Sequence, residues 1–101
     1  MSDQAIEAGS VFEKQKDIVH RRIAGENLLV PIRGRLADMQ RIYALNDVAD
    51  FIWDRVDGTA SVKDITDAVV ACFDTDRDRA AIDTPAMLAD LAAARLIVMV
   101  R

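Results

Sequence analysis

A chain of 101 residues is long enough for one domain with a two-layer core, but too short for separate cofactor and substrate lobes. Its 51% hydrophobic and 30% charged residues are typical of a soluble, folded protein. The formal net charge of −4 disfavours long-range attraction to nucleic-acid phosphate, so we expect no nucleic-acid partner. A small binding module therefore fits this chain better than a complete enzyme.

The single cysteine, Cys72, excludes an internal disulfide and a cysteine-rich zinc site, and it agrees with a reducing compartment. The first residues contain no basic segment followed by an apolar run, so no secretory signal is expected. The apolar run at residues 96–100 is far shorter than the roughly 20 residues that a membrane helix needs. We therefore expect a cytoplasmic protein with no membrane partner.

The first half of the chain predicts strands. Residues 1–16 are weakly patterned, and we expect a flexible N-terminal arm outside the core of a domain spanning residues 17–101. The aliphatic segments at residues 17–23 and 28–32 are separated by turn residues 24–27, which predicts a hairpin. Residues 39–45 then alternate in the manner of a third strand.

A first helix is predicted to follow the third strand without an intervening loop. Asn46 is a good N-cap, and Gly58 can end the helix with a positive φ. Ala49, Ile52 and Trp53 fall on one apolar stripe. We therefore expect Trp53 to be a core residue rather than a ligand-stacking one.

A second helix is predicted only a few residues later, which makes a tight helix-turn-helix. Ser61 with Asp64 three residues later is a near match to a capping box. Ile65, Val69 and Cys72 belong to the apolar face of this helix. We therefore expect the thiol to be buried and unreactive.

The last part of the chain predicts a polar connector, a third helix and a short terminal strand. Residues 74–83 are polar, and Thr84 followed by Pro85 is the pattern of an N-cap with proline in the first helical turn. The run at residues 97–100 is expected to form a short strand or an extended tail packed on the domain.

No catalytic or metal-binding constellation is visible. His20 is the only histidine, so one chain cannot build a histidine-based metal site. Asp74, Asp76 and Asp78 alternate like the start of a calcium loop, but Arg79 stands where that loop needs glycine. We therefore expect no metal and no cofactor.

The basic residues gather in the predicted sheet, whereas most acids lie in the predicted helices and the arm. This asymmetry has two interpretations: ordinary solvated strand edges, or a surface that attracts an acidic peptide segment. The basic residues in question are His20, Arg21, Arg22, Arg33, Arg35 and Arg41.

The order of these motifs resembles the PqqD family of peptide-recognition domains. The resemblance covers roughly residues 20–97, most of the chain. Family members commonly carry glycine where this chain has Arg95. The matching motifs are Val30-Pro31, Leu45-Asn46, Asp57-Gly58, Ser61-Val62-x-x-Ile65 and Arg95-Leu96-Ile97.

The resemblance implies an α+β, winged helix-turn-helix-like fold, with a three-stranded antiparallel sheet followed by three helices. It implies a non-catalytic chaperone that binds the leader of a ribosomally made precursor peptide and presents it to a radical S-adenosylmethionine enzyme. The pathway would be pyrroloquinoline quinone (PQQ) biosynthesis or, as we favour, related peptide modification more broadly. The peptide would extend the sheet between the third strand and the third helix. The candidate contacts are Met39, Gln40, Arg41, Ile42 and Tyr43 on the strand, and Met87, Asp90, Leu91 and Arg95 on the helix.

Other classes of protein stay open at this point. A winged-helix transcriptional regulator shares the helix-turn-helix, but Lys63 is the only base at residues 61–73 and Arg95 the only one at residues 84–96. A small enzyme has less support, because no nucleophile and base pair is visible. A purely structural subunit also fits. We expect a monomer or a weak homodimer.

Overall fold

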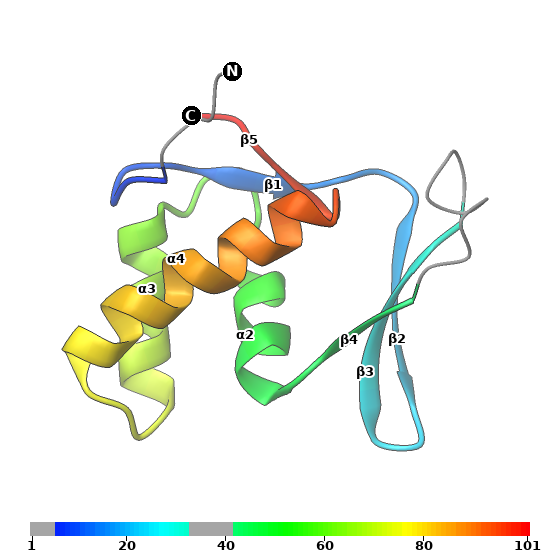
Figure 1. Cartoon of the computed structure of the whole chain (residues 1–101), viewed down its shortest axis with the longest axis horizontal. Helices are drawn as coiled ribbons and strands as arrows, with labels where there is room; N and C mark the ends of the chain where they lie inside the picture. The colour runs from blue at the N-terminus through cyan, green and yellow to red at the C-terminus, as the bar shows by residue number, and fades with distance from the viewer. Residues whose placement is uncertain (1–5, 33–41) are drawn as a thin grey trace.

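The computed structural model describes residues 6–32 and 42–101, which form two sheets and three helices (Figure 1). The arrangement confirms the predicted α+β, winged-helix-like fold, in which a three-stranded antiparallel sheet precedes the helices. The elements in chain order are β1 (Phe12–Lys14), β2 (Ile18–Ile23), β3 (Glu26–Pro31), β4 (Tyr43–Leu45), α2 (Asp47–Arg55), α3 (Val62–Cys72), α4 (Arg77–Ala93) and β5 (Ile97–Met99).

The larger sheet has the strand order β2-β3-β4, and both pairings are antiparallel. The predicted hairpin is present, but its turn is the two residues Ala24 and Gly25, with φ of 53° and 83°. Two positive φ values in succession give the turn whose twist matches the strands that it joins. Glu26 already belongs to β3, so the turn is shorter than the sequence pattern predicts.

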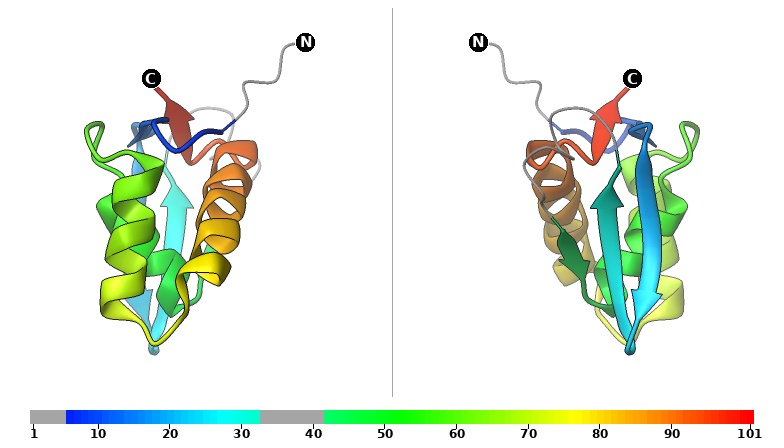
Figure 2. Two further views of the ribbon diagram at one scale, coloured as in Figure 1. Left: turned by 90° about the vertical axis from the view of Figure 1, so that its left-hand side faces the viewer. Right: turned by 90° about the vertical axis from the view of Figure 1, so that its right-hand side faces the viewer.

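One face of this sheet packs on the helices, and in the right-hand view of Figure 2 the other face has no helix over it. Leu29 at the centre of β3 is completely buried, and Leu45 of β4 is 6% exposed. Side chains alternate along a strand, so these residues identify the face of the sheet that forms the core.

Helix α2 begins and packs as the sequence predicts. The side chain of Asn46 accepts a hydrogen bond from the backbone N–H of Ala49 at 2.8 Å, which satisfies one of the donors left free at a helix N-terminus. Ile52 and Trp53 are 1% and 4% exposed, so Trp53 is confirmed as a core residue. The helix ends at Arg55, and Gly58 adopts a φ of +83° in the turn that follows.

Helix α3 confirms the capping box but corrects the prediction for its cysteine. The backbone of Asp64 donates to the Ser61 side chain, and the backbone of Ser61 donates to the Asp64 carboxylate. Cys72 is exposed, because it falls beside the buried stripe at the last residue of the helix. The next residue, Phe73, packs inward instead. Its ring is edge-on to that of Phe51, and the two ring centroids are 5.2 Å apart.

The predicted start of the last helix is wrong. Helix α4 begins at Arg77 after the N-cap Asp76, so most of the predicted connector is helical and Pro85 lies inside the helix. Ala80 and Thr84 are 2% and 1% exposed, which shows that packing extends the buried stripe before the proline. Pro85 lacks the N–H that would bond to the carbonyl four residues earlier, and this missing bond made it a plausible first-turn residue from the sequence alone. None of the helices in the described residues has the length and apolar character needed to cross a membrane.

The expectation that residues up to 16 lie outside the core is wrong for the second half of that segment. Strand β1 pairs with β5 in a two-stranded antiparallel sheet, with Phe12 opposite Met99. Val11 and Phe12 are 4% and 2% exposed and belong to the buried set. The predicted terminal strand is present as β5, but its pairing joins the two ends of the chain, which a local pattern does not reveal.

Replacing Trp53 with alanine should lower the free energy of unfolding by about 2 to 5 kcal/mol, because the change leaves a cavity in the core. Ile65→Ala, at a residue that is 1% exposed, should fall in the lower part of the same range. Ile82→Ala is the matched control, because this isoleucine is 68% exposed on α4. Chemical denaturation measures all three, and an unchanged midpoint for Trp53→Ala would contradict the assignment of this side chain to the core.

The stability of the protein should depend on pH through Asp57, which lies in the turn between α2 and α3. Its carboxylate accepts hydrogen bonds from the backbone of Ala60 and from the backbone and hydroxyl of Thr59, each at 2.9 Å. These bonds, that from Ala60 most strongly, lower the pKa of Asp57 from 3.8 to about 2. Because the folded-state pKa is depressed, the stabilising contribution is complete above 3.8 and is lost as the pH falls towards 2. Carboxyl NMR titration should give this low pKa, and Asp57→Ala should remove that part of the acid dependence of stability.

Candidate functional site

The candidate site begins at the edge of β4. Among the described residues, β4 pairs with β3 only, so its second edge presents backbone N–H and C=O groups without a strand partner. In the right-hand view of Figure 2, β4 is the outer strand on the same side of the molecule as α4. An edge strand of this kind is a place where an extended peptide can add to the sheet.

The position of this edge is fixed by the residues that follow it. Leu45 is buried in the core, and Asn46 immediately caps α2. The chain therefore passes from strand to helix without a loop, and β4 has little freedom to move relative to the helices. Ile42 is 62% exposed, whereas the next residue, Tyr43, is partly buried. The predicted alternation of exposed and buried side chains is therefore present in the described part of this segment.

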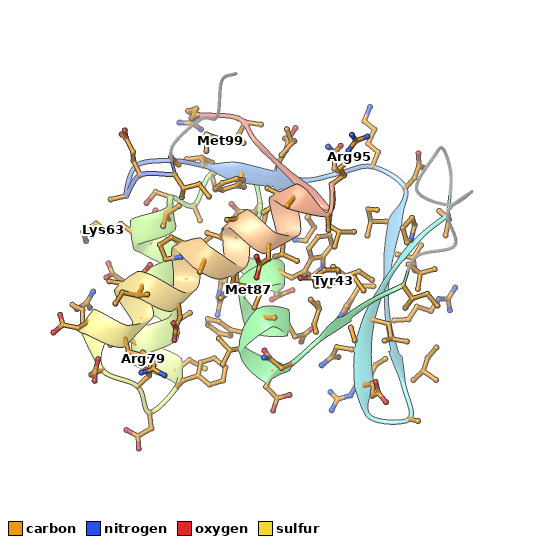
Figure 3. The ribbon with its side chains drawn as sticks, viewed as in Figure 1. Tyr43, Lys63, Arg79, Met87, Arg95 and Met99 are labelled. Carbon is orange, nitrogen blue, oxygen red and sulfur yellow. The ribbon has the colours of Figure 1, made fainter. Side chains whose placement is uncertain are left out.

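Helix α4 presents one flank on the side of β4. Positions three or four residues apart share a helical face, so Met87, Asp90 and the C-cap residue Ala94 lie along a common flank of α4. Met87 and Ala94 are partly buried against the core, as is Tyr43 of β4, whereas Asp90 is exposed. Figure 3 shows Tyr43 and Met87 on the strand and the helix that bound the site.

The nine predicted contact residues fall into three groups: residues outside the described part of the chain, one buried residue, and residues that are at least partly exposed. Met39, Gln40 and Arg41 lie outside the described residues. Leu91 is completely buried, so its side chain offers no surface to a peptide, and its place among the contacts needs correction. The helical period places it on the buried side of α4, where it supports the helix. Ile42, Tyr43, Met87, Asp90 and Arg95 all retain at least partial exposure.

Arg95 ends α4 in the left-handed backbone conformation, with a φ of 62°. Its N–H donates to the carbonyl of Ala92, and the N–H of Leu96 donates to the carbonyl of Leu91, both at 3.0 Å. This pair of bonds is the Schellman motif, in which glycine is the usual residue at the left-handed position. Arginine therefore occupies the glycine position without changing the end of the helix, and its side chain is exposed there (Figure 3).

Two basic residues of the sheet lie away from this site. Arg21 and Arg22 are exposed on β2, and β3 separates that strand from β4. His20, on the same strand, makes a 2.6 Å contact with the Asp50 carboxylate of α2. No local sequence pattern indicates this pairing, because the two residues are 30 positions apart along the chain. The described basic residues of the sheet therefore support the interpretation as ordinary solvated strand positions. They do not form a charged surface along the β4 edge.

A second concave surface lies on the opposite flank of α4. It is a groove of about 460 Å³ between the N-terminal segment, α3 and α4. Asp67 on its rim binds Lys63 at 3.1 Å and Arg77 at 2.6 Å, and these two cations, Arg77 most strongly, lower the pKa of the Asp67 carboxyl. The charges of the rim therefore largely satisfy one another. The groove is lined by Ile6, Glu7, Ala8, Val62, Lys63, Thr66, Asp67, Arg77, Ala81 and Pro85.

No group of three or more histidine, cysteine or carboxylate side chains is placed to hold a metal ion within residues 6–32 and 42–101.

Comparison with known proteins identifies the family. The sequence matches the family model described as "Coenzyme PQQ synthesis protein D (PqqD)" over residues 26–97. The chain belongs to the PqqD family. The matched region runs from the start of β3 to the first residue of β5 and contains both the β4 edge and α4. No curated protein matches the sequence.

Two solved structures share this PqqD-type fold. "TbiB1 in Complex with the TbiA(beta) Leader Peptide" is 22% identical, with a TM-score of 0.68 over 84% of this chain and 93% of that one. "Lasso peptide synthetase B1 complexed with the leader peptide" is 18% identical, with a TM-score of 0.71 over 86% of this chain and 96% of that one. At these identities the likeness establishes the common fold.

Replacing Arg95 with glycine should stabilise the protein by about 1 kcal/mol, because glycine adopts the left-handed conformation without a Cβ penalty. Arg95→Ala is the matched control, since alanine also removes the guanidinium but keeps the Cβ. Thermal or chemical denaturation should show this increase in stability for Arg95→Gly and not for Arg95→Ala. If the two variants were equally stable, the positive φ at position 95 would not be the source of the lower stability of the native protein.

Proposed function

We propose that this protein binds the leader segment of a ribosomally made precursor peptide and presents it to an enzyme that modifies the peptide. The observation that carries the proposal is the edge of β4 that has no strand partner among residues 6–32 and 42–101, next to the exposed flank of α4, in a chain of the PqqD family. The two solved structures of similar fold are complexes with leader peptides, which supports the same kind of ligand here.

Binding would occur by addition of a strand. The peptide would pair through its backbone with the free edge at residues 42–45, and the main-chain hydrogen bonds would supply affinity without reading the sequence. Alternate peptide side chains would point towards α4, where Tyr43 and Met87 offer partly buried apolar surface. Met39, Gln40 and Arg41 would lengthen the paired edge in this proposal.

Selection among peptides would come from the rim of the site. Asp90 is exposed on the flank of α4, and Arg95, which has the opposite charge, is exposed just beyond the C-cap of this helix. They would favour peptides that place complementary charges at two different points along the bound strand. The charges act through solvent, so they would affect specificity and association rate more than total affinity.

The proposed role is non-catalytic. The partner that receives the peptide would be a radical S-adenosylmethionine enzyme, acting in PQQ biosynthesis or in another pathway that modifies ribosomal peptides. Membership of the PqqD family supports this class of pathway, and the small size of the chain favours a presenting module over a complete enzyme.

An NMR titration with the leader segment of a candidate precursor peptide tests the proposal. Amides of residues 42–45 and of residues 87–95 should shift together as the peptide binds. Ile42→Pro should weaken binding by about tenfold, because proline removes a backbone donor from the edge. Ile42→Ala is the matched control and should bind nearly as well as the native protein, because it keeps the backbone N–H.

Circular dichroism must show that both Ile42 variants are folded. Shifts confined to residues 62–73 would place the site on α3 and contradict the proposed edge. The absence of shifts with the leader peptide would remove the support for peptide presentation. Tight, salt-sensitive binding to duplex DNA in a parallel titration would instead favour the transcriptional regulator.

A further inference from the structure

The outer face of the β2-β3-β4 sheet is largely apolar. Strand pairing places Val19 opposite Val30, and Leu28 opposite both Arg21 and Ala44. These residues alternate with Leu29, which is buried on the core side, so they share the opposite face. Within the strands that face consists of Val19, Arg21, Ile23, Glu26, Leu28, Val30 and Ala44.

Isoleucines extend this patch and are strongly exposed. Ile23 is 55% exposed at the hairpin end, Ile42 is 62% exposed just before β4, and Ile32 is 53% exposed one residue beyond β3. The right-hand view of Figure 2 shows this face turned towards the reader, with the helices behind the sheet. Single exposed isoleucines are ordinary, but several on one flat face together with valine and leucine form a patch typical of an interaction surface.

Within the strands, the charges on this face are few and balanced. Arg21 and Glu26 are its only charged residues within the strands, and neither forms an ion pair in the described part of the chain. The helices, in contrast, carry more acids than bases, and the whole chain has a net charge of −4. Two copies of this acidic protein therefore repel each other least where their sheet faces meet.

We propose that this face joins two copies of the protein in a two-fold symmetric dimer. Arg21 and Glu26 are diagonal neighbours, because Arg21 pairs with Leu28 and Glu26 pairs with Ile23. A two-fold axis lying in the plane of contact can bring Arg21 of each copy against Glu26 of the other. The face is therefore self-complementary, as a contact between identical surfaces requires. Each dimer would contain two such ion pairs around a centre that includes Leu28.

The size of the face makes the dimer weak. With strands about 4.8 Å apart and residues about 3.3 Å apart, a face three strands wide measures roughly 14 by 17 Å. Such a face buries less than the roughly 800 Å² per partner of a stable interface. The dimer should therefore form at protein concentrations of about 0.1 to 1 mM. The β4 edge and α4 stay free in this arrangement, so the dimer does not depend on the proposed peptide binding.

Sedimentation equilibrium of the full chain tests the dimer over about 10 µM to 1 mM, the range in which a weak interface is detected. Ile23→Lys places a charge in the patch and should raise the dissociation constant at least about tenfold. Ile82→Lys is the matched control, since this isoleucine is even more exposed at 68% but lies on α4. It should leave the dissociation constant unchanged. Both positions are exposed, so neither change should prevent folding.

Charge reversal distinguishes a specific two-fold contact from general adhesion of apolar surfaces. Arg21→Glu and Glu26→Arg should each weaken the dimer, because each replaces two attractions with two repulsions. The double variant Arg21→Glu/Glu26→Arg should restore the dissociation constant to within about threefold of the native value, because the pairs re-form with their charges exchanged. Single variants that the double variant does not rescue would overturn the two-fold arrangement.

A native protein that remains monomeric at about 1 mM would overturn the proposal as a whole. Accessibility of the isoleucine methyl groups to a soluble paramagnetic probe would then identify the occupant of the face. Protection in the monomer would point to residues 33–41 of the same chain, and full accessibility to a different protein. Leader-peptide titration of Ile23→Lys keeps the two proposals separate, because this variant should bind peptide as the native protein does.

Discussion

The direct junction between β4 and α2 is the constraint on which the arrangement of the site depends. Leu45 is anchored in the core, and the next residue, Asn46, caps the helix through a 2.8 Å hydrogen bond to the backbone of Ala49. No loop separates an edge strand from a helix that is itself fixed by Ile52 and Trp53. The free backbone groups of β4 are therefore held in place before any peptide arrives, and binding does not have to order this part of the edge.

Helix α4 separates two surfaces because it is long and buries only one stripe. The stripe runs through Ala80, Thr84, Leu88 and Leu91, which follow each other at intervals of four, four and three residues. Met87 and Asp90 then fall on the flank towards β4, and Ala81 and Pro85 on the flank that lines the groove beside α3. The same period that builds the core thus determines which side chains can meet a peptide. The buried position of Leu91 follows from this period as well.

Local signals in the sequence were sufficient wherever a structure depends on neighbours along the chain. The cap at Asn46, the capping box of Ser61 and Asp64, and the core position of Trp53 all follow from short-range chemistry, and the structure confirms them. The start of α4 was missed because Asp76 and Thr84 are both good caps locally. Burial of Ala80 against the rest of the core decides between them. The pairing of β1 with β5 was missed because it joins residues at opposite ends of the chain.

The apolar sequence of strand β3 predicts a strand that is covered on both faces, but helices cover only one of them. Leu28, Leu29 and Val30 form a continuous apolar run, a pattern typical of a strand covered on both faces. Helices cover the face of Leu29, while the face of Leu28 and Val30 meets no helix in Figure 2. An apolar face costs solubility when it is left in water, so its retention in an acidic, otherwise well-charged chain favours a role for it. The face adjoins the free edge of β4 at Ala44, so any protein that packs on the sheet would lie next to a peptide strand added at that edge.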